Sequence, residues 1–97
     1  MPPMPFTDLR FTAHVRQRMQ ERAITQDDVS SVLATGTIIE DYPTTLPYAS
    51  YLVLGWRGAR PLHIVAADNP ADQVTLVITV YEPDPLQWDA EFKVRRS

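Results

Sequence analysis

Residues 50–81 read SYLVLGWRGARPLHIVAADNPADQVTLVITVY and decide the fold. Gly58 and the segment from Asp68 to Asp72 are typical of turns. The runs on either side of these turns are rich in the β-branched and aromatic side chains that favour strands: residues 50–57, 61–67 and 74–81. Because strands joined by short turns pair with their neighbours, this stretch predicts an antiparallel meander.

Two helices are expected before this meander. Phe11, Val15 and Met19 recur every four residues, which indicates an amphipathic helix that ends near Arg22. Thr12 can cap its start, since a threonine hydroxyl accepts an unpaired backbone N–H.

The second helix is predicted from its ends. Thr25 followed three residues later by Asp28 resembles a capping box with a short acid, and Gly36 is a suitable terminator. The β-branched residues 37–42 predict a further strand. We therefore expect an α+β fold in which a helical hairpin packs on one face of a four-stranded antiparallel sheet.

The two ends of the chain are expected to contribute little to the fold. Residues 1–10 are predicted to be a flexible N-terminal arm, and residues 11–97 a single α+β domain, because 97 residues suffice for one hydrophobic core. Pro83 and Pro85 should stop the last strand. Leu86 to Phe92 is predicted to form a short C-terminal helix.

Composition excludes several classes of protein. The chain has no cysteine, so a disulfide scaffold, a thiolate zinc site and a thiol nucleophile are excluded, and we expect a cytoplasmic protein. No apolar run approaches about 18 residues, so no membrane span is expected. Two distant histidines and three glycines favour neither a metal site nor a phosphate-binding loop, and we expect no cofactor.

The charge balance argues against a strong nucleic-acid binder. Twelve acidic residues against nine basic ones give a net charge of −3, whereas proteins that grip phosphate backbones are usually basic. A local basic patch is still compatible with this net charge, because the basic residues gather in the first helix, around Arg57 and Arg60, and at the C-terminal tail.

The first helix carries a candidate anion site. His14, Arg18 and Arg22 are spaced by four residues and share one stripe at the edge of the apolar seam. A solvated helical face is one interpretation of this stripe. A preorganised anion site is the other.

His63 lies in the middle of a predicted strand. It is either a buried histidine bonded to a neighbour or an acid–base group facing a cleft. If the turn at Gly58 uses three residues, His63 lies opposite Gly55, which leaves space above the imidazole, and Tyr51 shares its face. A slip of one residue would abolish this grouping.

The second turn extends the group. If Ala67 pairs near Thr75, His63 lies beside Thr79, and Tyr81 shares the same face. The two hydroxyls could then orient a phosphate or a sugar next to an imidazole. This inference depends on the assumed register in the same way.

The motifs together resemble a known family. They are F-T-x-H-x-x-x-R-M-x-x-R-x-I-x-x-x-D-V from Phe11, Y-L-V-L-G-W from Tyr51, R-P-L-H-I-V from Arg60, and T-V-Y-E-P-D-P-x-x-W from Thr79. The chain resembles domain of unknown function 4258 from Phe11 to about Arg96. That family has no established activity. Its architecture is similar to the RelE/ParE-like toxin fold, whose members include metal-independent ribonucleases of toxin–antitoxin systems and inhibitors of gyrase.

The resemblance implies a RelE-like toxin-type protein, and our leading hypothesis is a metal-independent ribonuclease that acts on RNA by acid–base catalysis. One histidine would remove the ribose 2′-hydroxyl proton and the other would protonate the leaving oxygen, while arginines stabilise the phosphate charge. The candidate catalytic residues are His14, Arg18, His63, Thr79 and Tyr81. The candidate substrate-binding residues are Arg22, Tyr51 and Arg57.

The alternative is a non-enzymatic protein-interaction module. In that case the helix stripe would dock an acidic partner, and His63 would be a packed core residue. The net acidity of the chain favours this alternative. The candidate partners are therefore RNA, an antitoxin protein or a second copy of the chain.

Overall fold

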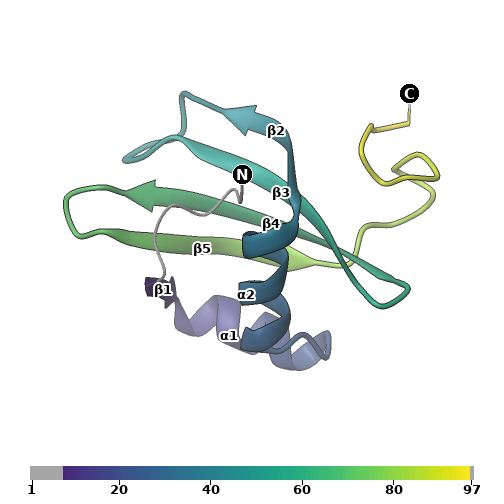
Figure 1. Ribbon diagram of the computed structural model, residues 1–97, viewed down its shortest axis with the longest axis horizontal. Coiled ribbons are helices and arrows are strands. Elements are labelled where there is room, and N and C mark those ends of the chain that lie inside the picture. Colours follow the sequence, from purple (N-terminus) through teal and green to yellow (C-terminus); the bar gives the residue numbers. More distant parts are fainter. Residues whose placement is uncertain (1–7, 97) are drawn as a thin grey trace.

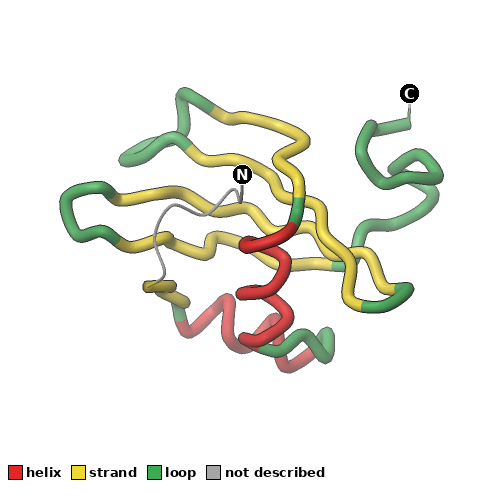
Figure 2. The backbone as a smooth tube through the Cα atoms, in the orientation of Figure 1, coloured by secondary structure: helices red, strands yellow, loops and turns green. Residues whose placement is uncertain are grey.

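The computed structural model describes residues 8–96 and has two N-terminal helices packed on a five-stranded mixed sheet (Figures 1 and 2). The elements in chain order are β1 (Asp8–Phe11), α1 (Ala13–Glu21), α2 (Gln26–Thr35), β2 (Thr37–Tyr42), β3 (Ser50–Arg57), β4 (Arg60–Asn69) and β5 (Val74–Tyr81). The strand order across the sheet is β1-β5-β4-β3-β2. The strands from β2 to β5 pair antiparallel in chain order, and the short turns predict this for β3 to β5.

The fifth strand corrects two expectations. β1 pairs in parallel with β5, with Asp8 opposite Val74 and Phe11 opposite Val77, so the sheet is mixed rather than purely antiparallel. Residues 8–10 belong to this strand and not to an N-terminal arm, while residues 1–7 lie outside the described residues. Leu9 and Phe11 are partly buried against the core. Two apolar residues in four give too short an alternation to indicate a strand from sequence.

Both helices begin as their capping residues predict. The Thr12 hydroxyl accepts a hydrogen bond from Val15 N in α1, and Thr25 and Asp28 form a reciprocal capping box at α2. The end of α1 is a Schellman turn, in which Ile24 N donates to Met19 O and Ala23 has a positive φ of 54°.

The core lies between the helices and one face of the sheet. Its helical members are Val15, Met19, Val29, Val32 and Leu33, and its sheet members include Tyr51, Val53, Leu62, Ile64 and Val80. Two glycines bring α2 close to the sheet, because a Cβ at Gly55 would stand 2.7 Å from a Val32 methyl group and one at Gly36 would stand 2.6 Å from Leu54 O. The φ of Gly36 is −76°, which any residue can adopt. Glycine is therefore needed at this end of α2 for the close packing and not for its backbone conformation.

The segment after β5 is not helical, which corrects the expected C-terminal helix. Residues 82–96 follow β5 as turns with one antiparallel bridge between Trp88 and Arg95, and they form the yellow segment of Figure 1. The Asp89 carboxylate accepts from the backbone N–H groups of Lys93 and Val94, and Phe92 has a positive φ of 61°. Trp88 and Phe92, which are four residues apart, therefore lie in a folded loop and not on one face of a helix.

Candidate functional site

The turn between β3 and β4 places His63 on the face of the sheet away from the helices. Gly58 and Ala59 alone form this turn, so Arg57 pairs with Arg60 and His63 lies opposite Leu54. The predicted pairing of His63 with Gly55 was wrong by one residue. Because adjacent residues of a strand face opposite sides, Gly55 and Tyr51 lie on the helical face.

A bulge in β5 aligns hydroxyl side chains with His63. Ala66 pairs with Val77 but Val65 pairs with Thr79, so Ile78 is the extra residue. Thr79 and Tyr81 therefore share the face of His63, as predicted, and Tyr81 rather than Thr79 lies directly opposite it. Without the bulge Tyr81 would point to the helical face.

A second bulge acts in the same way in β2. Ile38 pairs with Val53, but Glu40 pairs with Leu52, so Ile39 is the extra residue. A regular ladder would place Glu40 opposite Tyr51 on the helical face. The bulge turns Glu40, and Tyr42 after it, toward the face of His63.

His63 is fully enclosed by its neighbours. Its relative exposure is 0%, and the Trp88 ring lies perpendicular to the imidazole at 4.4 Å between centroids. His63 Nε2 lies 2.8 Å from Phe92 O, and because a carbonyl only accepts, Nε2 carries the hydrogen. Nδ1 then accepts from the Tyr81 hydroxyl at 3.1 Å. Burial lowers the pKa of His63, so the imidazole is neutral.

Charged groups lie at the more open edge of this face. Arg95 Nε is 3.4 Å from Glu40 Oε2, and its guanidinium lies 4.5 Å from the centre of the Trp88 ring. The Tyr42 hydroxyl donates to the same carboxylate. The Glu40 side chain is 27% exposed and that of Arg95 57%. We call Glu40, Tyr42, His63, Tyr81 and Arg95 the His63 cluster.

The His63 cluster combines the groups that acid–base chemistry on a phosphate ester needs. It offers a carboxylate as proton acceptor, two phenols as donors and a guanidinium for negative charge. Burial raises the pKa of Tyr81, and the charges of Arg95 and Glu40 act on it in opposite directions. Within residues 8–96, no group of three or more His, Asp or Glu side chains is placed to hold a metal ion.

Sequence reasoning missed Glu40, Tyr42 and Arg95. Glu40 and Tyr42 alternate on the predicted strand 37–42, which was a usable signal for a shared polar face. The bulge at Ile39, which decides the face they share, has no such signal. Arg95 could not be assigned to this cluster, because the expected helix from Leu86 to Phe92 would give the tail a different course.

The helix stripe does not meet His63. α1 buries Val15 and Met19 against the helical face, so its exposed residues His14 and Arg18 lie on the other side of the sheet from the His63 cluster. Arg18 pairs with Glu21 at 3.4 Å. Arg22 Nη1 donates to Val80 O at 2.7 Å, on β5 beyond the end of the β1 pairing. These placements leave His14 and Arg18 exposed on α1, while Arg22 links the end of α1 to β5.

Arg57 links α2 to β3. Its Nε lies 2.9 Å from Asp28 Oδ1, and its Nη1 donates to the Ser31 hydroxyl at 2.8 Å. Thr25, which donates its backbone N–H to Asp28, and Arg57 together lower the pKa of the Asp28 carboxyl. The guanidinium is thus held on the helical side, apart from His63.

Tyr51 belongs to a separate hydrogen-bonded group. Its hydroxyl donates to Asp68 Oδ1 at 2.9 Å, and the same oxygen accepts from the fully buried Thr75 at 2.8 Å. Burial, followed by the bond to Asp68, raises the pKa of Tyr51. This phenol serves as a structural donor under the helical core.

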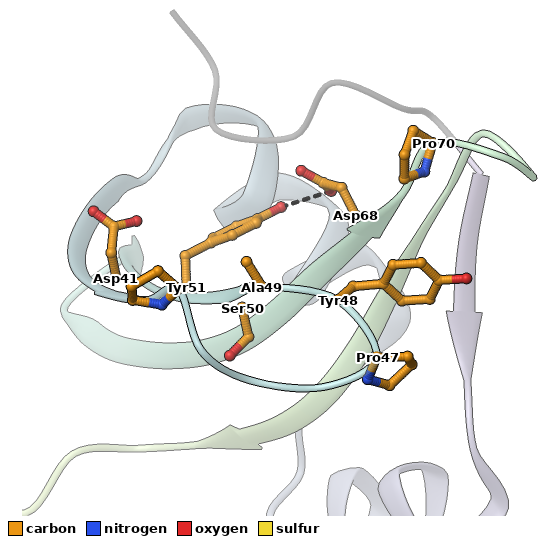
Figure 3. Close-up of a pocket in the computed structure, with 9 residues that line it drawn as sticks. Asp41, Pro47, Tyr48, Ala49, Ser50, Tyr51, Asp68 and Pro70 are labelled. Carbon is orange, nitrogen blue, oxygen red and sulfur yellow. Dashed lines mark hydrogen bonds between the residues drawn. The ribbon is translucent and has the colours of Figure 1, made fainter.

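An open cavity of about 890 Å³ lies beside Tyr51 at the loop end of the sheet (Figure 3). The figure shows the Tyr51 ring reaching toward Asp68, and it labels Tyr48 and Pro70 among the residues that line the cavity. The charged groups that line it are Asp41 and Asp68. With two carboxylates and no cation among the lining residues of the described range 8–96, it is unsuited to a polyanion such as RNA.

The fold and the His63 cluster define a small α+β domain with a group of titratable side chains on the face of its sheet away from the helices. The chain belongs to the family described as a domain of unknown function, DUF4258, whose model matches residues 11–82. The match ends before Trp88 and Arg95, so the tail that covers His63 lies outside it. No curated protein and no solved structure matches the chain. Among the helices of residues 8–96, none is long and apolar enough to cross a membrane.

Proposed function

We propose that the chain is a RelE-like, toxin-type protein that cleaves RNA as a metal-independent ribonuclease at the His63 cluster. One observation carries the proposal. Two separate bulges, at Ile39 and Ile78, turn Glu40 and Tyr81 onto the face of His63, where Arg95 reaches the same carboxylate. Bulges are frequent beside active sites because they re-aim side chains.

Glu40 replaces the histidines as the general base in this proposal. Its carboxylate is partly exposed, whereas His63 is enclosed and both its ring nitrogens have partners. Glu40 takes the proton of the ribose 2′-hydroxyl, and the 2′-oxygen forms a bond to phosphorus. The bond from phosphorus to the 5′-oxygen breaks, which leaves a 2′,3′-cyclic phosphate.

The other members of the cluster have supporting roles. The Arg95 guanidinium leaves Glu40 and pairs with the phosphate of the substrate. It stabilises the negative charge that develops on the phosphate oxygens. Tyr81 turns its single proton from His63 Nδ1 to the leaving 5′-oxygen. Water then returns a proton to the phenolate, and Glu40 releases to water the proton that it took. His63 fixes the orientation of Tyr81 through Nδ1. Catalytic roles for His14, Arg18 and Thr79 stay predictions that the same assay tests.

The nature of the products tests this chemistry. Purified protein incubated with single-stranded RNA and a chelator is expected to yield fragments with 2′,3′-cyclic phosphate and free 5′-hydroxyl ends. Fragments with 5′-phosphates, or cleavage that the chelator abolishes, would contradict the mechanism, because both indicate attack by a metal-activated water. Intact RNA at all protein concentrations would contradict the activity itself.

A second candidate is the non-enzymatic interaction module, with an antitoxin-like protein or a second copy of the chain as partner. The enclosure of His63 favours it, since a fully buried histidine with two satisfied nitrogens is sufficiently explained as a packing residue. His63→Phe, which keeps a ring but removes both nitrogens, separates the candidates. Unchanged RNA cleavage with lower stability would assign His63 to packing, whereas lost cleavage in a folded variant would assign it to the reaction.

A further inference from the structure

A groove beside the His63 cluster contains an exposed indole and an ammonium group. It has a volume of about 330 Å³ and lies where Trp56 of β3 and Lys93 of the tail approach Gly36 and Thr37. That volume is at the lower end of the roughly 300–1,000 Å³ usual for ligand pockets. Trp56 is 48% exposed, which is unusual for so large an apolar side chain.

The groove is connected to the His63 cluster through Phe92. The Phe92 ring meets the Trp56 ring edge-on at 5.9 Å between centroids, and its carbonyl accepts from His63 Nε2. Trp56 also shares the face of Leu54, the residue opposite His63. A ligand lying on Trp56 would thus occupy the position next to the cluster along the same face.

The chemistry of the groove suits a nucleotide. The Phe92 ring meets the indole edge-on, and Trp56 is 48% exposed, so part of the indole is accessible for stacking with an unpaired base. The Lys93 side chain is 52% exposed and has a weak ion pair with Glu91 at 3.7 Å, so its ammonium can exchange that partner for a phosphate.

We infer that the Trp56 groove is a base-binding subsite, in which one nucleobase of single-stranded RNA stacks on Trp56 while Lys93 contacts a neighbouring phosphate. This inference rests on the proposed ribonuclease function and adds the substrate class, single-stranded rather than duplex RNA. Bases inside a duplex are already stacked on each other and cannot lie on an indole.

The test measures binding without cleavage. A short single-stranded RNA with 2′-O-methyl riboses lacks the attacking hydroxyl, so it binds without reacting. Trp56 and Trp88 are the tryptophans of the chain, and Trp88 is 1% exposed, so quenching of the fluorescence by the RNA reports on Trp56. Saturable quenching is expected, together with binding at least about tenfold weaker for Trp56→Leu than for the wild type.

Matched variants and a duplex complete the experiment. Leu46→Ala removes an exposed apolar side chain from the loop between β2 and β3 and should leave the affinity unchanged. Lys93→Ala should lower the dependence of log Kd on log salt by about one, whereas Arg10→Ala on β1 should not. Equal affinity of Trp56→Leu and wild type, or equal affinity for the methylated duplex, would overturn the subsite.

The outcomes separate the subsite from the ribonuclease. If the methylated RNA quenches Trp56 while the wild type leaves unmodified RNA intact, the subsite stands and the catalytic proposal fails. If the wild type cleaves RNA and Trp56→Leu cleaves it with unchanged KM, the subsite fails and the catalytic proposal stands.

Discussion

Gly55 of β3 lies directly against Val32 of α2, with no room between them for even one added carbon. A Cβ on Gly55 would stand 2.7 and 2.9 Å from the two Val32 methyl carbons. This contact sets the distance of α2 from the sheet. It also accounts for the missing side chain at position 55, which sequence reasoning had attributed to space for His63.

Gly55→Ala is expected to lower the free energy of unfolding by about 1–3 kcal/mol, because the added methyl group forces α2 away from β3. Denaturant unfolding measures the change. Gly58→Asn is the control: Gly58 has a φ of 65° with nothing within 4 Å, and asparagine tolerates this conformation. Equal stability of Gly55→Ala and wild type would contradict the close packing.

His63 should make stability depend on pH. Burial lowers its pKa in the folded state, so the unfolded chain binds the proton more readily. Stability should therefore be fully present above the unfolded pKa of about 6.5 and decrease as pH falls below it, by at most about 1.4 kcal/mol per pH unit.

The histidine variants isolate this effect. His63→Gln keeps a donor for Phe92 O and an acceptor for the Tyr81 hydroxyl but does not titrate, so its stability should change less between pH 7 and pH 5 than that of the wild type. His14→Gln removes the exposed histidine of α1 and should keep the wild-type profile. Parallel profiles for His63→Gln and wild type would count against a buried neutral imidazole.

Tyr51→Phe should cost about 1 kcal/mol of stability, because it removes the hydroxyl that donates to Asp68. Thr75 donates to the same oxygen, so Tyr51→Phe and Thr75→Val should be non-additive in a double-mutant cycle. RNA cleavage by Tyr51→Phe should match the wild type. A large loss of cleavage in a stable variant would restore the predicted substrate-binding role of Tyr51.

Ala23→Gly should stabilise the protein by roughly 1 kcal/mol. Ala23 closes the Schellman turn after α1 with a φ of 54°, which strains any residue with a Cβ and suits glycine. Thermal unfolding should show a higher Tm. Ala34→Gly, inside α2, is the matched control and should lower Tm, because glycine is unfavourable within a helix.

The regular parts of the fold could be predicted because their signals are local. Thr25 and Asp28 mark the start of α2, and the β-branched run 74–81 marks β5. β1 was missed because its four residues alternate for too short a distance. The tail was assigned to a helix because Trp88 and Phe92 are four residues apart, although their contacts with the sheet and not a helical face explain their burial.

The candidate site was less predictable because it depends on register. A two-residue turn in place of three moved Tyr51 and Gly55 to the other face from His63. The extra residues Ile39 and Ile78 then determined which side Glu40 and Tyr81 face. Nothing in a single sequence distinguishes a bulged strand from a regular one of the same composition.

The rate of RNA cleavage by Glu40→Gln tests the central claim most directly. Glutamine keeps the shape of Glu40 and can still accept from the Tyr42 hydroxyl, but it cannot take a proton. With wild type and the exposed-residue control Glu21→Gln measured under single-turnover conditions, the account predicts a loss of about 10²–10⁴-fold for Glu40→Gln and none for the control. Cleavage by a folded Glu40→Gln at the wild-type rate would contradict it.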